Sequence, residues 1–260
     1  MIKDLMSSQE WDEEWENRYV SQPTAARLTH LLRRYATRAQ RKKLTKIIDL
    51  LGDSPKTVIE LGCSPGTMLN ELCMLRPMHT YSGIDYAPKG LQAASRLLQS
   101  NNFKNVELIL GDILTYEPKK TYDLVVSFGL IEHFDNPTEA ILAHKKFTRL
   151  SGLVVCTVPN YSNRYVKNVM ERYRPSDVAK HNFSIMNPEV IAKSFHMAGF
   201  SDVHSGGCTP LFLPMPKENF SWTTRLYQIM SLIWNGMAAG LPSKLAGKGW
   251  YWGSGVAHES

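Results

Sequence analysis

The sequence predicts an α/β protein built on a doubly wound, mostly parallel β-sheet. Strand-like and helix-like runs alternate between residues 55 and 205, which is the pattern of a parallel sheet. The first strand-like run closes on a glycine-rich turn, VIELGCSPGT, and a helical run follows directly. The next two strand-like runs each end in an aspartate. Because ligands of such sheets bind at the carboxyl ends of the strands, these features predict a binding site along one edge.

Residues 1–54 are predicted to form an N-terminal helical cap. Apolar periodicity indicates three helices, Ser8–Tyr19, Pro23–Arg38 and Gln40–Leu51. In the first of them Trp11, Trp15 and Tyr19 recur at every fourth position and share one face. Such an aromatic stripe is more often core packing than a substrate contact, so we expect it to pack in a core, with a substrate contact over the site as the alternative.

Residues 55–208 are expected to form the core domain. Its strand-like runs are Thr57–Leu61, Thr80–Ile84, Val106–Leu110, Tyr122–Phe128 and Leu153–Val158. Its helical runs are Met68–Leu75, Lys89–Ser100, Pro137–Leu150 and Pro188–Ala198. Gly199 follows the last helix, at a position where glycine commonly ends one.

The turn after the first strand is suited to hold part of a cofactor. A strand, a glycine-rich turn and a helix N-terminus expose backbone N–H groups and the positive end of a helix dipole. Asp85 closes the second strand 23 residues beyond Gly62, where a carboxylate can accept both hydroxyls of a ribose. Asp112 closes the third strand. A dinucleotide fold would need G-x-G-x-x-G, and this turn reads G-C-S-P-G instead.

This layout of Glu60, Gly62, Gly66, Asp85 and Asp112 resembles the class I S-adenosylmethionine-dependent methyltransferases over about residues 56–205. The resemblance implies S-adenosyl-L-methionine as cofactor and a seven-stranded sheet whose last strand is antiparallel. It places the turn against the methionine part of the cofactor, Asp85 at the ribose and Asp112 at the adenine amino group. It also implies contacts for neighbouring positions, namely Cys63, Ser64, Tyr86, Ile113, Ser127 and Phe128.

One position of the turn departs from the family pattern. The middle glycine that is common there is Ser64 in this chain. We therefore expect the backbone of Ser64 to avoid positive φ, the region that glycine alone visits freely. Pro65 pre-sets a turn and would compensate for the missing glycine.

The run YDLVVSFGLIEHFDN predicts chemistry at the same edge of the sheet. It resembles the fourth motif of small-molecule methyltransferases of the ubiquinone-biosynthesis and glycan-modifying kind, in which a Glu-His pair often follows this strand. That resemblance places His133 near the transferable methyl. A sulfonium methyl mainly needs an aligned nucleophile, and a hydroxyl acceptor also gains from a base. His133 is therefore the first candidate base, with a structural histidine as the alternative.

His181 is the second candidate. The stretch that begins KHNFS resembles a segment of glycan and natural-product methyltransferases in which a loop histidine precedes a helix. A structural hydrogen bond is the competing interpretation. We expect no metal site, because there is no H-x-x-x-H or paired Cys/His cluster, and the adjacent pair Asp135 and Asn136 cannot form an octahedral site.

The last part of the chain changes in composition. Asp202–Cys208 and Trp250–His258 resemble the two closing strands of the family, so residues 249–260 would carry the last strand. Residues 209–248 then form a long insertion, which we expect to be a mobile cap over the acceptor. Apolar residues at helical spacing predict a helix there. Because Leu226–Pro242 is shorter than the ~20 apolar residues that cross a bilayer, no transmembrane segment is expected.

Composition favours a globular, intracellular protein. The chain is 43% hydrophobic, and its four cysteines form no C-x-x-C, which indicates reduced thiols. Its acidic start differs from a signal peptide, so we expect a cytoplasmic location. The net charge is +6, and residues 18–46 carry many basic residues and no acidic ones. This run is expected to be a solvated helical face, with contact to an anionic surface as the alternative.

We expect transfer of a methyl group by in-line displacement to a small-molecule acceptor, at oxygen. The acceptor classes are a natural product, an isoprenoid or a carrier-linked sugar. An RNA or protein methyltransferase, or a C- or N-methyltransferase without a base, is the alternative. Nucleic acid is disfavoured because the N/D-P-P-Y/F turn of base-amino methyltransferases is replaced by Ser-Phe-Gly-Leu. A short-chain oxidoreductase is disfavoured because its only Tyr-x-x-x-Lys match, Tyr116 to Lys120, contains Pro118. Retention of the cofactor positions argues against a non-catalytic scaffold.

Overall fold

The computed structural model describes residues 5–20, 41–214, 216, 221–241, 245 and 247–258. The helix expected at Pro23–Arg38 lies outside these residues. The described part contains a seven-stranded sheet with the strand order β3-β2-β1-β4-β5-β7-β6. The strands are β1 (Thr57–Leu61), β2 (Thr80–Asp85), β3 (Glu107–Leu110), β4 (Tyr122–Phe128), β5 (Thr148–Pro159), β6 (Phe200–Cys208) and β7 (Trp250–Ala257).

The strand directions confirm the expected fold class. The pairs β1–β2, β1–β4, β2–β3 and β4–β5 are parallel, whereas β7 runs antiparallel to both β5 and β6. The strand order reverses direction between β1 and β4, because the chain builds outward to β3 before it returns to β4. The carboxyl ends of β1 and β4 therefore lie side by side at the switch point, where ligands bind in such folds.

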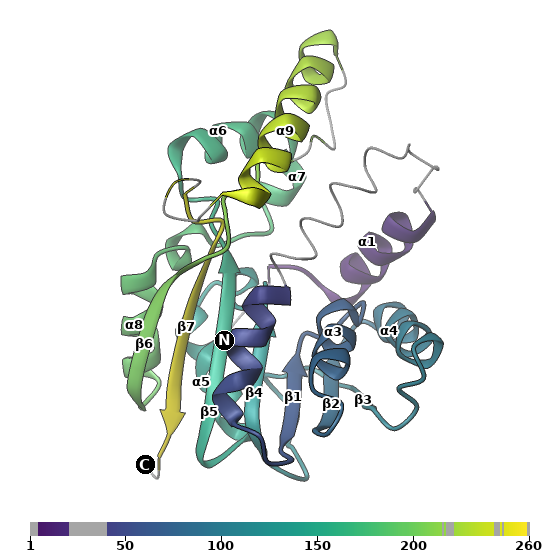
Figure 1. Ribbon diagram of the computed structural model, residues 1–260, viewed down its shortest axis with the longest axis vertical. Helices are drawn as coiled ribbons and strands as arrows, with labels where there is room; N and C mark the ends of the chain where they lie inside the picture. Colours follow the sequence, from purple (N-terminus) through teal and green to yellow (C-terminus); the bar gives the residue numbers. More distant parts are fainter. Residues whose placement is uncertain are drawn as a thin grey trace.

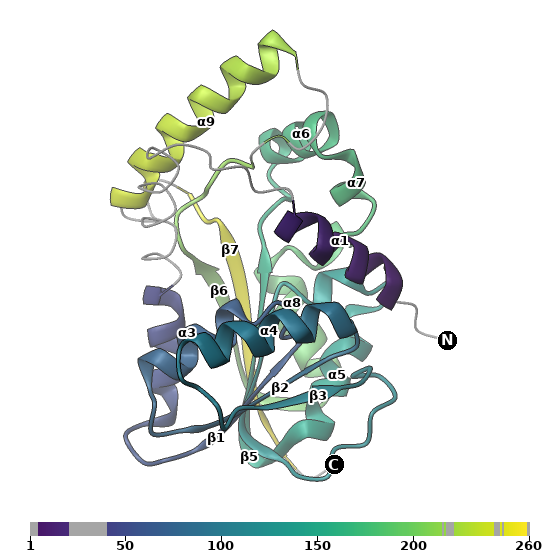
Figure 2. The same ribbon diagram turned by 90° about the vertical axis from the view of Figure 1, so that its right-hand side faces the viewer.

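Helices cover both faces of the sheet (Figures 1 and 2). One face carries the helical residues 41–48, the 3-10 turn η1 (Asp49–Leu51), α3 (Thr67–Leu75) and α4 (Pro88–Ser100). Their buried core includes Leu44, Leu69 and Leu98. The other face carries α5 (Pro137–Phe147) and α8 (Pro188–Met197), with Phe147 and Phe195 in its core. Apolar side chains at helical spacing thus dictate which side of each helix meets the sheet.

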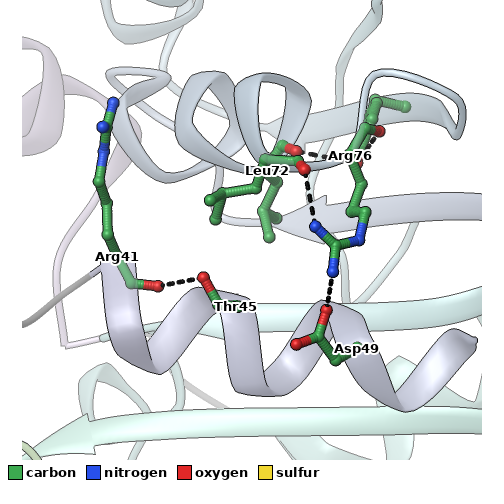
Figure 3. A network of polar contacts seen from close by, with 7 residues as sticks. Arg41, Thr45, Asp49, Leu72 and Arg76 are labelled. Carbon is green, nitrogen blue, oxygen red and sulfur yellow. Dashed lines mark hydrogen bonds and ion pairs between the residues drawn. The ribbon is translucent and has the colours of Figure 1, made fainter.

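A polar network joins the N-terminal helical residues to α3 (Figure 3). The Arg76 guanidinium pairs with the Asp49 carboxylate, and the Arg76 backbone N–H donates to the Leu72 carbonyl. Arg41 forms an ion pair with Glu71. Exposed ion pairs of this kind contribute about 0–1 kcal/mol each, so burial of residues such as Leu44 and Ile48 holds this helix in place.

Four further helices lie at the end of the molecule toward which β4 and β5 run (Figures 1 and 2). They are α1 (Ser8–Val20), α6 (Arg164–Tyr173), α7 (Pro175–Val178) and α9 (Trp222–Gly240). Short 3-10 turns, η2 (Ile131–His133) and η3 (Phe183–Ile185), complete this end. The structure confirms the first predicted helix at α1, whereas α6 and α7 were not predicted from the sequence.

One predicted boundary is wrong. The sequence placed a helix over Pro137–Leu150, but α5 ends at Phe147 and the chain is extended from Thr148. The reason is tertiary, because Thr148 pairs with Tyr122 of β4 and so starts β5 early.

Candidate active site

A pocket at the carboxyl edge of the sheet collects most of the predicted site residues. Its walls come from the ends of β1, β2 and β4, from α1, and from the first residue of β7. It is lined by both candidate histidines and by these expected cofactor contacts: Gly62, Ser64, Asp85, Tyr86, Asp112, Ile113 and Phe128. These residues come from distant parts of the chain and meet at one edge of the sheet, as the topology predicted.

The glycine-rich turn has the backbone geometry that its sequence demands. Gly62 and Gly66 have φ of 69° and 88°, in the region that glycine visits freely. A Cβ on Gly66 would lie 2.7 Å from the Ala94 Cα of α4. Ser64 occupies the position where the family commonly has glycine. It is not among the described non-glycine residues with positive φ, which agrees with the expectation that its backbone avoids that region.

Asp85 is held rigidly at the end of β2. One carboxylate oxygen accepts the Ser64 backbone N–H at 2.9 Å, and the other accepts the Ala87 backbone N–H at 2.9 Å. Burial raises the pKa of this carboxyl, while the N–H groups act to lower it. These bonds orient the carboxylate beside the turn and leave lone pairs that can accept further donors.

The next part of the wall comes from the ends of β2 and β3. Asp112 accepts the Leu114 backbone N–H at 2.9 Å, which fixes the loop that carries Ile113. The Tyr86 hydroxyl donates to the Met6 carbonyl at 2.8 Å, and the Ser8 hydroxyl donates to the Tyr86 carbonyl at 2.7 Å. The start of α1 is therefore tied directly to the pocket wall.

Four of the expected cofactor residues lie outside the pocket lining: Glu60, Cys63, Gly66 and Ser127. Cys63 points into the core against Leu69, and Gly66 begins α3. The Ser127 hydroxyl lies 3.0 Å from Nε2 of the buried His144 on α5, because alternate residues of β4 face opposite sides of the sheet.

Glu60 is buried beneath the turn. Its pKa is raised well above the usual range, first by burial and then by the charge of Asp85, while the Leu69 backbone N–H acts to lower it. One oxygen of its carboxyl has no hydrogen-bond partner among the described residues. The raised pKa favours the protonated carboxyl, which can donate one hydrogen bond as well as accept others.

His133 and His181 lie together at the other end of the pocket. Their ring centroids are 4.7 Å apart. The His133 Nδ1 is 2.7 Å from the Lys180 carbonyl, and the His181 Nδ1 contacts the Asp177 carbonyl. Since a carbonyl only accepts, each Nδ1 carries the proton in the neutral ring and each Nε2 is left as an acceptor. Burial lowers the pKa of His181, which favours its neutral form.

Aromatic side chains surround the two histidines. The Trp11 ring meets His133 edge-on at a centroid distance of 4.9 Å, and Trp11 stacks on Trp15 at 5.7 Å. Tyr161 meets His181 edge-on at 5.6 Å. Trp11 and Trp15 were expected in a core, but both line the pocket. Their shared face was predicted from the four-residue spacing and the helical cap from residues 1–54, whereas the contact of this face with the two histidines depends on tertiary folding.

α1 is anchored over the pocket by two further polar contacts. The Lys89 backbone N–H at the start of α4 donates to the Asp12 carboxylate at 2.8 Å. The Lys180 ammonium donates to Glu14 at 3.1 Å. α1 thereby bridges the cofactor side of the edge and the loop that carries His181.

Glu132, the first residue of the Glu-His pair, lines the pocket but was not predicted as a site residue. Its side chain is 1% exposed and lines the pocket, and one carboxyl oxygen has no hydrogen-bond partner within the described residues. Burial raises its pKa to about 8, against the lowering effect of the Lys43 charge. Ligand atoms of Glu132, His133 and His181 lie within 4.8 Å of one another, so this cluster is able to hold a cation that the sequence did not predict.

Lys43 lies behind the pocket wall and was also missed. Its ammonium is 4.1 Å from the Trp250 ring centroid and 5.2 Å from that of Phe128. Burial lowers its pKa to about 8, whereas the charges of Cys208, Glu60 and Glu132 raise it. The contacts attach two pocket-lining aromatic rings to the N-terminal helical residues.

Comparison with known proteins identifies the family to which the chain belongs. A family model described as a methyltransferase domain matches residues 53–228, more than half of the chain. The chain belongs to the class I S-adenosylmethionine-dependent methyltransferases. The match covers the sheet through β6, together with the glycine-rich turn and both strand-terminal aspartates.

Similar sequences include two O-methyltransferases. This chain is 28% identical over 127 residues to malonyl-[acyl-carrier protein] O-methyltransferase of Halalkalibacterium halodurans, covering 45% of this chain and 46% of that protein. It is 31% identical over 120 residues to ubiquinone biosynthesis O-methyltransferase of Nitrosomonas europaea, covering 45% and 50%. The chain matches about half the length of these relatives.

Solved structures share the fold. Geranyl diphosphate C-methyltransferase from Streptomyces coelicolor, in complex with Mg²⁺, geranyl diphosphate and S-adenosyl-L-homocysteine, superposes with a TM-score of 0.61 at 11% identity, covering 91% of this chain and 86% of that chain. Phosphoethanolamine N-methyltransferase 2 of Haemonchus contortus, in complex with S-adenosyl-L-methionine, gives 0.58 at 16% identity, covering 84% and 53%. At these identities the likenesses show the shared fold alone.

Proposed function

We propose that this chain transfers a methyl group from S-adenosyl-L-methionine to an oxygen atom of a small-molecule acceptor. The candidate classes are a natural product, an isoprenoid or a carrier-linked sugar. The observation that carries the proposal is one pocket that joins Asp85 and Asp112 at one end to His133 and His181 at the other. The two O-methyltransferases among its relatives support transfer to oxygen.

The residues present fit the cofactor. Asp85 has a fixed carboxylate for the ribose hydroxyls, and Asp112 has one at the edge suited to the adenine amino group. When bound, S-adenosyl-L-methionine supplies an already activated sulfonium methyl and leaves as S-adenosyl-L-homocysteine.

The protein then has two tasks, positioning and proton removal. Trp11, Phe134 and Tyr161 line the acceptor end and exclude water, which favours an aligned acceptor over hydrolysis. His133 accepts the acceptor's hydroxyl proton at Nε2, because Nδ1 donates to the Lys180 carbonyl. The new carbon–oxygen bond forms as the carbon–sulfur bond breaks and its electron pair returns to sulfur, so the positive charge of the sulfonium is replaced by the proton on His133.

A cation-assisted transfer is a second candidate, favoured by the clustering of Glu132, His133 and His181. A divalent cation there would lower the pKa of a bound hydroxyl, and His133 would serve as its ligand rather than as a base. Transfer to a carbon or nitrogen atom can rest on positioning without a base, so an acceptor of that kind would leave both histidines dispensable.

The decisive experiment compares His133→Ala and His181→Ala with the wild type, in the presence and absence of a chelator. If His133 is the base, His133→Ala should lower kcat by about 10²–10⁴-fold and leave the cofactor affinity nearly unchanged. The His181 variant should mainly raise the Michaelis constant of the acceptor. Chelator should leave the wild-type rate unchanged. Loss of activity on chelation, restored by a divalent metal, would instead assign the cluster to a cation. A full rate in both variants would reject base catalysis.

A further inference from the structure

α9 presents an apolar face to solvent. Its outward side chains recur at helical spacing and lie at least half exposed, namely Trp222, Leu226, Ile229, Met230, Ile233 and Met237. Leu241 and Leu245, just beyond the helix, are exposed as well. A contiguous exposed apolar surface of this length is unusual on a soluble protein and marks a site of interaction.

The opposite face of α9 is polar and packs against the protein. Thr224 and Ser231 are fully buried. The Trp234 indole N–H donates to the Leu211 carbonyl at 2.9 Å, and the Tyr227 hydroxyl donates to the Pro214 carbonyl at 2.9 Å. Asn235 both donates to and accepts from the Leu213 backbone, at 3.1 and 2.7 Å.

The amphipathic pattern is therefore inverted. An ordinary surface helix buries its apolar stripe and exposes its polar face. Here specific hydrogen bonds seat the polar face, so a simple rotation that buried the leucine and isoleucine side chains would break them. Tyr227 also stacks on Tyr173 of α6 with a centroid distance of 5.0 Å, which further fixes the orientation. The apolar face is built to point outward.

The charge of this segment indicates the partner. Residues 219–258 contain no acidic residue but include Arg225, Lys244 and Lys248. Burial raises the pKa of the Cys208 thiol at the end of β6, while the charges of Lys43, Lys248 and Lys46 act to lower it. Of these, Lys46 is exposed and Lys248 is partly exposed, whereas Lys43 is buried. An apolar face with basic neighbours is complementary to an anionic lipid surface, whereas a second copy would bring like charges together.

We propose that α9 is an interfacial anchor, whose apolar face inserts into the surface of an anionic lipid bilayer. The helix lies in the interface rather than across it: within the described chain, no helix is long and apolar enough to span a membrane. α9 stands at the end of the molecule toward which β4 and β5 run (Figures 1 and 2). The pocket is lined by residues at the same carboxyl edge of the sheet. Provided that the proposed function holds, the acceptor class is an amphiphile that resides in the bilayer.

The test is co-sedimentation with vesicles, in the absence of any acceptor. The full chain should bind vesicles of phosphatidylcholine with added phosphatidylglycerol and bind pure phosphatidylcholine more weakly. Changing Ile229→Glu together with Ile233→Glu should lower the partition coefficient by about tenfold or more, because two apolar anchors are lost and two negative charges are added.

A matched control carries Leu142→Glu and Met197→Glu on α5 and α8. These side chains are similarly exposed, at 49% and 66%, and the same two charges are added. The control should keep most of the binding. Calorimetry with S-adenosyl-L-homocysteine reports whether each variant retains a folded cofactor site.

Absence of wild-type binding to the anionic vesicles, or equal binding by both variants, would overturn the anchor. A wild-type dimer that only the α9 variant dissociates would assign the face to a second copy. Neither result would affect the proposed transfer, which is measured separately.

Discussion

Neighbouring residues at the sheet edge take different roles because a strand alternates its side chains between two faces. Phe128 lines the pocket, whereas Ser127, one position earlier, reaches His144 on the opposite side. Asp85 and Asp112 were predictable because a residue at the end of a strand lies at the carboxyl edge of the sheet, whichever face its side chain points to. Residues such as Tyr161 were not, because their approach to the site depends on tertiary folding alone.

His144 predicts how stability responds to acid. Its Nδ1 donates to the Ala140 carbonyl at 2.7 Å, its Nε2 accepts from Ser127, and burial lowers its pKa to about 4. The unfolded chain has the ordinary histidine value near 6.5, so it binds more protons than the folded state between these pH values. The stabilisation is present above about pH 6.5 and is lost as pH falls toward 4, by at most about 3 kcal/mol.

Urea unfolding of the wild type and of His144→Gln at pH 7.5 and at pH 5 measures this contribution. The wild type should lose more stability between the two pH values than the variant does, since glutamine does not titrate. Identical pH dependence in both proteins would show that His144 is not the responsible group.

At the scale of elements, the sequence predicted the strands of the core within about one residue, apart from the early starts of β5 and β6. Alternating β and α runs closed by glycine or proline carry this information locally. The helix α6 was missed although Val166, Val169, Met170 and Tyr173 recur at helical spacing and are all buried. The signal was present, but no strand followed to mark the run as part of the alternation. The short α7 has too few residues for a period to be detected.

The packing of the glycine-rich turn against α3 and α4 can be tested with alanine substitutions at two glycines. Gly52→Ala places a Cβ where nothing lies within 4 Å, so only the positive-φ backbone opposes it. Gly66→Ala meets the same kind of opposition and also drives a Cβ into Ala94 of α4. Backbone strain alone costs about 1–3 kcal/mol. The clash at Gly66 should in addition displace α3 from α4 and distort the turn.

Calorimetry with S-adenosyl-L-homocysteine should therefore show affinity weakened by about tenfold or more in Gly66→Ala, equivalent to about 1.4 kcal/mol or more. Gly52→Ala should bind almost as the wild type does. Circular dichroism confirms that both variants are folded before they are compared. Equal affinities would mean that the turn tolerates a shift of α4.

At the scale of the whole molecule, the pocket is assembled from α1, three strand ends, the loops after β4 and β5, and the start of β7. The sequence predicted the shared edge from topology and an N-terminal helical cap over residues 1–54, but not that Trp11 of α1 meets His133. It also predicted residues 209–248 as a cap over the acceptor. The described residues of that segment do not line the pocket, and α9 instead carries the outward apolar face. Anchor and cap are thus two proposals for one segment, and they predict different behaviour.

Replacement of residues 212–246 by a short turn distinguishes them. The β6–β7 pair is closed at this end by Cys208 opposite Trp250 and by a 3.1 Å bond from the Gly249 N–H to the Thr209 carbonyl. The hairpin therefore survives the deletion, and cofactor affinity should remain within about twofold of the wild type, a small change on the free-energy scale. Vesicle binding should be lost. If α9 is an anchor, transfer to an acceptor delivered in detergent micelles persists, because the pocket residues are intact. Loss of transfer to every form of acceptor, with cofactor binding unchanged, would show instead that the segment closes over the substrate.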